Sequence, residues 1–150
     1  VHRGEDVVGA SFIEYDFDLE CCGYKKCEKP SQRYIYLSNR EITEMLSKQG
    51  GGLKFVNVAS GDKFVSDPVL RDTLKKEFDI NACDMETAAI AYVAYLTGKP
   101  FACLRRISDD AGDDATDSYH DMNNKPMTDL PKLLLEVINL LFGKTYFWKK

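Results

Sequence analysis

Short apolar runs alternate with segments of helical periodicity along this chain, and this alternation limits the fold more than any other feature of the sequence. Residues 53–60 (LKFVNVAS) and 101–108 (FACLRRIS) are typical of buried strands. A helix is expected to begin at Asp67-Pro68, because Asp caps a helix N-terminus and Pro suits the first turn. The order of these segments predicts the α/β class, with three α/β/α layers in which helices cover a largely parallel mixed central sheet.

Two more helices follow from the spacing of apolar residues. Residues 84–97 carry an apolar set at helical intervals and precede Gly98 and Pro100, which are typical of helix ends. A last helix is expected to be capped by Thr128. The faces predicted to be buried are Met85, Ala88, Ala89, Tyr92, Val93 and Leu96 in the first, and Leu130, Leu133, Leu134, Val137, Ile138 and Leu141 in the second.

The first fifty residues predict a strand, a loop and a helix. Residues 6–19 are rich in β-branched and aromatic side chains, which favours a strand, whereas the polar residues 20–32 favour a loop. Residues 33–38 lead into a helix whose start is marked by Ser38 and Glu41, because S-x-x-E is a capping box. The glycines from position 50 onward end this helix.

Length and charge restrict the class of protein. The chain has 150 residues, the size of one domain, and its net charge of −4 with scattered basic residues argues against a nucleic-acid-binding surface. The longest apolar stretch, residues 133–142, is too short to span a bilayer, and no basic-then-apolar leader opens the sequence. We therefore expect a cytoplasmic protein with one domain over residues 1–150. Because the sequence opens at Val1 within a segment that already looks structured, we expect this domain to be incomplete at its N-terminus.

Five cysteines leave two interpretations open for the loop near the N-terminus. Cys83 and Cys103 lie among apolar residues and are expected to be reduced core residues. Cys21, Cys22 and Cys27 could supply three ligands of a zinc site. No fourth Cys or His stands at the usual spacing, which favours a reduced surface loop, and we expect no metal.

Polar residues at the ends of predicted strands mark the candidate site, because ligands of open α/β sheets bind beyond the carboxyl ends of the strands. The stretches are 60–65 (SGDKFV), 84–86 (DME) and 108–109 (SD). Asp109 could act as a general acid if apolar neighbours favour its protonated form, with Ser108 fixing its orientation. Alternatively, Asp109 is one of six solvated aspartates between residues 109 and 121. This loop does not fit a calcium-binding loop, which needs Gly and Glu where Asp114 and His120 stand.

The other two stretches each have a functional and a structural interpretation. Glu86 could offer two acceptor oxygens to the hydroxyls of a ribose, or could simply favour the first turn of a helix. Phe64 could stack on a flat base, with Gly61 allowing close approach of the backbone to a ligand, or could lie in the core. Met85 is most simply a core residue.

Taken together, SGDKFV, ACDMETAAIA and the R-x-I-S-D of residues 105–109 resemble the nucleoside phosphorylase/nucleosidase superfamily in order and spacing. Within it they are most similar to the bacterial 5′-methylthioadenosine/S-adenosylhomocysteine nucleosidases. The resemblance runs from about residue 53 to the C-terminal helix, with weaker similarity over residues 1–19. It implies that Asp109 protonates, or hydrogen-bonds to, N7 of adenine while Ser108 holds it in place. It also implies that Phe64 stacks on the purine and that the backbone of Val65 recognises its edge.

On the sugar side, the resemblance implies that Glu86 binds the ribose hydroxyls and that Met85 packs against the sugar. The implied reaction is hydrolysis of the N-glycosidic bond of an adenine nucleoside, with no cofactor. In this family the N-terminal half supplies further strands and the carboxylate that activates water, and no residue of this chain matches that carboxylate. Arg106 stands where these nucleosidases usually have a small residue, so the surroundings of Asp109 could differ.

Two other functions stay open. A phosphorylase of the same superfamily would use phosphate as the nucleophile, although the particular residues of the S-G-D-x-F and I-S-D motifs favour hydrolysis. A truncated domain could instead bind nucleosides, or only assemble, without turnover. The superfamily commonly forms dimers or hexamers. The resemblance therefore implies a homodimer or larger homo-oligomer that binds a small-molecule purine nucleoside. It implies no binding to nucleic acid or to a membrane.

Overall fold

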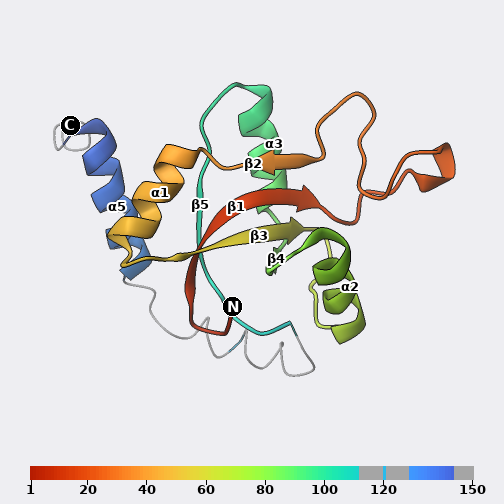
Figure 1. Ribbon diagram of the computed structural model, residues 1–150, viewed down its shortest axis with the longest axis horizontal. Helices are drawn as coiled ribbons and strands as arrows, with labels where there is room; N and C mark the ends of the chain where they lie inside the picture. Colours follow the sequence, from red (N-terminus) through yellow and green to blue (C-terminus); the bar gives the residue numbers. More distant parts are fainter. Residues whose placement is uncertain (112–119, 121–128, 144–150) are drawn as a thin grey trace.

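A computed structural model describes residues 1–111, 120 and 129–143, and strands and helices alternate along them (Figure 1). The strands are β1 (Asp6–Glu14), β2 (Ile35–Leu37), β3 (Lys54–Ser60), β4 (Ala82–Asp84) and β5 (Cys103–Arg106). The helices are α1 (Arg40–Gln49), α2 (Pro68–Phe78), α3 (Thr87–Leu96) and α5 (Asp129–Phe142), with a short 3-10 helix over Glu20–Cys22. The strands predicted over residues 6–19 and 101–108 are present but shorter than expected.

The strands form one mixed sheet in the order β2-β1-β3-β4, with β5 also paired to β1. β1, β3 and β4 run parallel to one another. β2 and β5 both run antiparallel to β1, and they pair with different parts of it. The mixed sheet is confirmed. Its parallel part is limited to three strands, however, and β5 runs against the direction that the strand–helix alternation predicted.

A β-bulge decides which residues of β1 face each layer. The register of β1 against β3 shifts between Gly9 and Ser11. This extra residue places Val7 and Phe12 in the same buried cluster although they are five positions apart. Gly9 leaves room for the ring of Phe12, because a Cβ at position 9 would lie 2.5 Å from a ring carbon.

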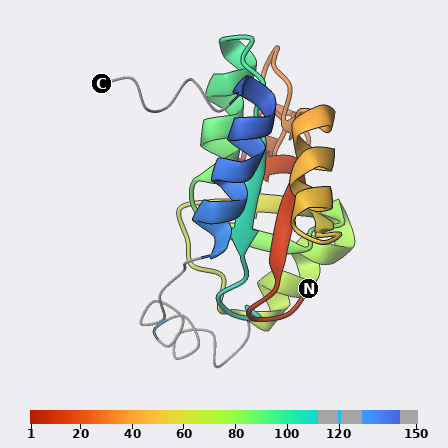
Figure 2. The same ribbon diagram turned by 90° about the vertical axis from the view of Figure 1, so that its left-hand side faces the viewer.

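Helices cover both faces of the sheet, which confirms the three-layer α/β/α prediction (Figure 2). α3 packs on one face, and α1 and α5 lie side by side on the other, where α2 covers the remaining part. The buried clusters are Val7, Phe12, Tyr36, Val56, Val58, Ala88, Ala91 and Cys103 beneath α3; Val8, Leu46 and Val137 beneath α1 and α5; and Ile13, Tyr15, Cys27, Ala59, Val65, Leu74 and Ile80 beside α2.

The side of α3 that faces the sheet overlaps only partly with the predicted face, of which Ala88 is buried and Tyr92 half-buried as expected. Ala88 and Ala91 are buried, whereas Val93 and Leu96 are 58% and 61% exposed. Every position from Ala88 to Leu96 carries an aliphatic or aromatic side chain. Apolar spacing therefore could not identify which side of this helix packs on the sheet.

The start of α1 also differs from the prediction. The N-cap residue is Asn39, whose side chain accepts a hydrogen bond from the backbone N–H of Ile42 at 3.0 Å. Ser38, the predicted cap, donates its hydroxyl to the carbonyl of Gly9 instead. The helix therefore begins one residue later than the S-x-x-E pattern indicated, because Ser38 is engaged by β1.

The two remaining helices agree better with their predictions. Asp67 caps α2, since its carboxylate accepts from the backbone N–H of Val69 at 2.9 Å. In α5, Val137 is buried on the predicted face, although Leu134 is 45% exposed. The predicted cap Thr128 lies outside the described residues. None of the helices in the described part of the chain combines the length and apolar content needed to cross a membrane.

Candidate active site

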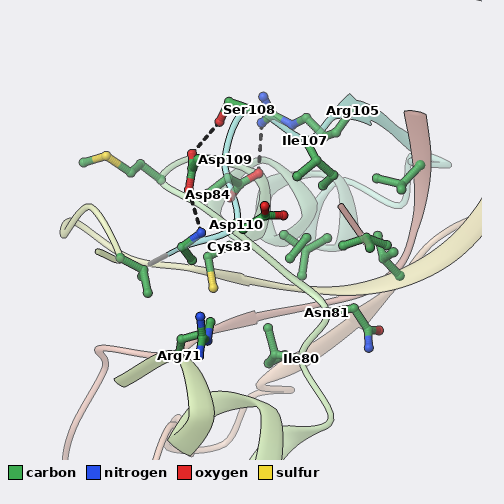
Figure 3. Close-up of a pocket in the computed structure, with 18 of the residues that line it drawn as sticks. Arg71, Ile80, Asn81, Cys83, Asp84, Arg105, Ile107, Ser108, Asp109 and Asp110 are labelled. Atoms are coloured by element: carbon green, nitrogen blue, oxygen red, sulfur yellow. Dashed lines mark hydrogen bonds and ion pairs between the residues drawn. The ribbon is translucent and has the colours of Figure 1, made fainter. Parts of the chain in front are cut away.

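One cavity of about 580 Å³ gathers all three sequence stretches (Figure 3). Its lining combines Val56 and Val58 of β3, from the cluster beneath α3, with Ile80 and Cys83, from the cluster beside α2. Its volume is in the range that holds small organic ligands. The predicted site residues that line it are Phe64 and Val65 from the β3–α2 loop, Met85 and Glu86 from the β4–α3 junction, and Ser108 and Asp109 from the segment after β5.

The segment after β5 lines the cavity although it does not follow the carboxyl end of a parallel strand. Ser60 and Asp84 lie side by side at the carboxyl ends of the parallel strands β3 and β4. β5 is antiparallel, so its last residue, Arg106, pairs with Asp6 at the start of β1. The rule for parallel sheets therefore accounts for the first two stretches but not for the position of Asp109.

Local hydrogen bonds hold the carboxylate of Asp109 in one orientation. The hydroxyl of Ser108 donates to Oδ2 at 2.7 Å, and the backbone N–H of Ala111 donates to Oδ1 at 2.9 Å. Asp109 is half-buried. Its neighbour Asp110 is exposed and accepts a hydrogen bond from the backbone N–H of Arg3 at 3.1 Å. The two adjacent carboxylates thus have different surroundings, and Asp109 is the one ordered by its own turn.

The loop after β3 places an aromatic ring at the cavity. Phe64 is 38% exposed and lines the cavity, whereas Val65 is buried and belongs to the cluster beside α2. The hydroxyl of Tyr15 donates to the carbonyl of Lys63 at 3.2 Å, which ties the backbone before Phe64 to the end of β1. The core interpretation of Phe64 is therefore wrong, because the residue is only partly buried.

Gly61 serves the packing of the chain itself. A Cβ at this position would lie 2.6 Å from the ring of Tyr15 and 2.8 Å from the carboxyl carbon of Asp16. The carboxylate of Asp16 accepts a hydrogen bond from the backbone N–H of Asp62 at 2.7 Å. We expected Gly61 to allow a ligand to approach the backbone, but the groups that approach it are those of Tyr15 and Asp16.

Met85 and Glu86 lie exposed between β4 and α3. Met85 is 46% exposed, so its interpretation as a core residue is wrong. Glu86 occupies the N-cap position of α3, one residue before the first turn, and its side chain makes no capping hydrogen bond. The side chain of Glu86 is 61% exposed, and its carboxylate lies 3.5 Å from the guanidinium of Arg105. A carboxylate in this position has oxygens available to a ligand.

Asp84 organises this junction, although the sequence placed it in a candidate stretch without assigning it a separate role. Its Oδ1 accepts hydrogen bonds from the hydroxyl of Ser60 at 2.5 Å and from the backbone N–H groups of Glu86 at 3.3 Å and Thr87 at 3.1 Å. Its Oδ2 accepts from the hydroxyl of Thr87 and lies 3.0 Å from Arg105 (Figure 3). The pattern D-x-x-T at the end of a strand has the spacing of a helix cap and could have indicated this role.

Arg105 and Cys83, which both line the cavity, have shifted pKa values. Burial opposes the charge of Arg105, but attraction to Asp84 and to other nearby groups outweighs it, so the pKa of Arg105 is raised. Burial, followed by the charges of Asp84 and Asp109, raises the pKa of the Cys83 thiol to about 11. At neutral pH, Arg105 is therefore a cation and Cys83 a neutral thiol.

Arg106, which stands where a small residue was expected, is paired within the sheet. Its guanidinium makes two hydrogen bonds to the carboxylate of Asp6, at 2.7 Å and 2.8 Å. Asp6 and Arg106 are opposite each other in the antiparallel register of β1 and β5. The charge of Arg106 is therefore balanced across the two strands.

The three clustered cysteines have different surroundings. Cys21 and Cys22 are exposed, with their sulfur atoms 3.7 Å apart. Cys27 is buried, and its thiol donates to the carbonyl of Tyr15 at 3.3 Å. Within the described ranges, no group of three or more His, Cys, Asp or Glu side chains is placed to hold a metal ion.

Comparison with known proteins identifies the family of this fold and cavity. The Phosphorylase superfamily matches residues 1–139, so the chain belongs to this superfamily. The 5′-methylthioadenosine/S-adenosylhomocysteine nucleosidase of Shewanella baltica is 31% identical over 145 aligned positions, which cover 91% of this chain and 61% of the relative. The enzyme of the same name from Hydrogenovibrio crunogenus is 28% identical, covering 92% of this chain and 62% of the relative.

Solved structures share the fold. The Helicobacter pylori 5′-methylthioadenosine/S-adenosylhomocysteine nucleosidase with butyl-thio-DADMe-Immucillin-A has a TM-score of 0.86 and 26% identity, covering 92% of this chain and 61% of that chain. The futalosine hydrolase of the same organism has the same TM-score and coverage and 25% identity. The superfamily resemblance and the α/β/α fold are thus confirmed. The chain spans about three fifths of the length of the relatives it matches.

Proposed function

We propose that this cavity binds an adenine nucleoside and that the protein hydrolyses its N-glycosidic bond. The substrate class is 5′-methylthioadenosine or S-adenosylhomocysteine, and adenine is released. The observation that carries this proposal is the convergence of three distinctive stretches of sequence on one cavity. The names of the relatives support hydrolysis rather than phosphorolysis. An aspartate-to-asparagine variant of the Helicobacter pylori nucleosidase, 25% identical to this chain, holds 5′-methylthioadenosine in its active site, which supports the substrate class.

The proposed base subsite consists of Asp109, Ser108, Phe64 and Val65. Asp109 donates a proton or a hydrogen bond to N7 of adenine, and Ser108 keeps its carboxyl group oriented. The partly exposed ring of Phe64 stacks on the purine, and the backbone of Val65 recognises the polar edge of the base. Withdrawal of electrons into the purine weakens its bond to the sugar and makes adenine a better leaving group.

The proposed sugar subsite consists of Glu86 and Met85. The exposed carboxylate of Glu86 accepts hydrogen bonds from the ribose hydroxyls, and Met85 packs against the sugar. Positive charge builds on the ribose as the bond breaks, and a negative carboxylate beside the sugar stabilises that charge. Water then adds to the anomeric carbon and completes the hydrolysis, with no cofactor. No residue of this chain matches the family carboxylate that activates this water.

The test is release of adenine from 5′-methylthioadenosine by the 150-residue chain, with and without inorganic phosphate. Asp109→Asn keeps the shape of the side chain but removes its ability to deliver a proton, so the rate should fall at least about 100-fold. The matched control is Asp110→Asn, because Asp110 also lines the cavity but its exposed carboxylate accepts from the backbone N–H of Arg3 and has no assigned role toward adenine. This control should retain the rate of the unchanged protein.

The possible outcomes of this test separate hydrolysis, phosphorolysis, binding without turnover and failure of the proposal. Release without phosphate that is lost in Asp109→Asn supports hydrolysis at this cavity. Release that requires phosphate would assign the protein to the phosphorylases. Nucleoside binding by a folded chain without any release would identify a binding domain that is not an enzyme by itself. A folded chain that neither binds nor cleaves the nucleoside would contradict the proposal.

We also propose a single domain of a cytoplasmic protein that forms a homodimer or larger homo-oligomer. The outer side of α3 supports self-association, because Ile90, Val93 and Leu96 are each more than half exposed. No charged residue occurs between Thr87 and Gly98. An uncharged apolar surface can pair with its own copy around a two-fold axis without repulsion between like charges.

A further inference from the structure

We propose that Asp84 is a positioning residue that keeps Arg105 from occupying the carboxylate of Glu86. In this way Asp84 sets the preference of the site for a nucleoside over the free base. The inference rests on the proposed function, because it assumes that Glu86 binds ribose. It concerns a residue that need not touch the substrate and acts through its two neighbours.

The position of Asp84 is fixed from three directions. It ends β4, and its side chain is only 14% exposed. Ser60, at the end of β3, donates its hydroxyl to Asp84 and also accepts the backbone N–H of Ala88 at 2.8 Å. Thr87 donates to Asp84 through both its backbone and its hydroxyl. The carboxylate therefore joins two strand ends to the first turn of α3 and cannot turn away from Arg105 without breaking this network.

The guanidinium of Arg105 is placed between two acidic side chains. One terminal nitrogen lies 3.0 Å from Asp84, 3.5 Å from Glu86 and 2.8 Å from the hydroxyl of Thr87. The ion pair with Asp84 is shorter and more buried, and attraction between opposite charges weakens with distance and with exposure to solvent. The contact with Glu86 is long and exposed, so it contributes little. The present geometry therefore holds Arg105 closest to Asp84, and only a long hydrogen bond of 3.5 Å to Oε2 of Glu86 competes with the hydroxyls of a diol.

Loss of charge at Asp84 should reverse this arrangement. In Asp84→Asn, the amide oxygen can still accept from Ser60 and from the backbone of Thr87. The amide nitrogen would then face Arg105, and two donors cannot satisfy each other. Glu86 becomes the nearest carboxylate for the guanidinium, and the shift needed is small. The carboxylate of Glu86 would then be paired with Arg105 before a nucleoside binds, whereas the groups that contact adenine would be unchanged.

Calorimetric titration with 5′-methylthioadenosine and with adenine tests this inference. Asp84→Asn should weaken binding of the nucleoside about tenfold and change binding of adenine less than about twofold. Adding Arg105→Gln to this variant removes the competing cation and should restore nucleoside affinity to within about threefold of the unchanged protein. Arg105→Gln alone should leave nucleoside affinity equal or higher, and it keeps the cap of α3 intact even if Asp84→Asn folds poorly.

Three results would overturn the inference while leaving the proposed function in place. The first is that Asp84→Asn weakens binding of the nucleoside and of adenine equally. The second is that the double variant recovers no nucleoside affinity, and the third is that Arg105→Gln alone loses more than about tenfold in nucleoside affinity. Any of these would make Asp84 a structural cap only. An unchanged protein that binds neither ligand would refute the proposed function, and this inference with it.

Discussion

At the scale of single residues, Gly61 shows that the chain's own packing fixes the loop that carries Phe64. Gly61→Ala would place a methyl group within 2.8 Å of Tyr15 and Asp16, so one of them must move. We expect a loss of about 1–3 kcal/mol in the free energy of unfolding, measured by urea denaturation. The control is Ser66→Ala in the same loop, where the side chain is exposed and the change should be close to zero. Equal stability of both variants would contradict the close contact at Gly61.

Buried thiols give a second prediction at the residue scale. Burial raises the pKa of Cys27 and of Cys83 to about 11, from the ordinary value of 9.0. Between these values the unfolded chain loses its thiol protons while the folded chain keeps them, so folding becomes less favourable as pH rises. Each thiol should remove roughly 1–3 kcal/mol of stability between pH 9 and 11, measured by urea denaturation across that range. Cys27→Ala should make the fall of the free energy of unfolding with pH shallower, whereas Cys21→Ser, at an exposed thiol, should leave it unchanged. The same dependence on pH in both variants would refute the raised pKa of Cys27.

At the scale of secondary structure, the start of α1 can be tested directly. Asn39→Ala removes the side chain that accepts from Ile42 and should cost about 1 kcal/mol in the free energy of unfolding, measured by thermal or urea denaturation. Asn39→Asp preserves an acceptor at the N-cap and should retain most of the stability. If Asn39→Ala is neutral, Asn39 does not cap the helix as described.

The elements also show which parts of the structure the sequence could predict. Helix α2 was predictable because Asp67-Pro68 marks its start in a way that neighbouring segments do not alter. The buried side of α3 was not predictable, because an almost wholly apolar helix has no polar face to contrast with. The direction of β5 was hidden as well, since four residues carry no signal of direction and pairing with β1 decides it. The residues at the candidate site could be named from their motifs, and D-x-x-T indicates that Asp84 bonds to the start of α3. Its contacts with Ser60 and Arg105 could not be predicted, because these partners are distant in sequence and only the fold brings them together.

At the scale of the whole molecule, the outer side of α3 gives a test of self-association. Val93→Glu places a charge in the middle of the exposed apolar side and should weaken association at least about tenfold, measured by sedimentation velocity over a range of concentrations. Val69→Glu on α2 is the matched control, because Val69 is also exposed, at 73%, but lies on a different helix. A monomeric unchanged protein, or an assembly that Val93→Glu leaves intact, would contradict the proposed use of α3.

Every functional role proposed for this protein requires that the cavity between the β3–α2 loop, the β4–α3 junction and the segment after β5 is a nucleoside site. A crystal structure of the chain with 5′-methylthioadenosine tests this claim most directly, and it does not require turnover. We predict adenine stacked on Phe64 with N7 within about 3.2 Å of the Asp109 carboxyl group, and ribose hydroxyls within about 3.2 Å of Glu86. A nucleoside bound elsewhere, or bound here with its ribose directed away from Glu86, would contradict the account.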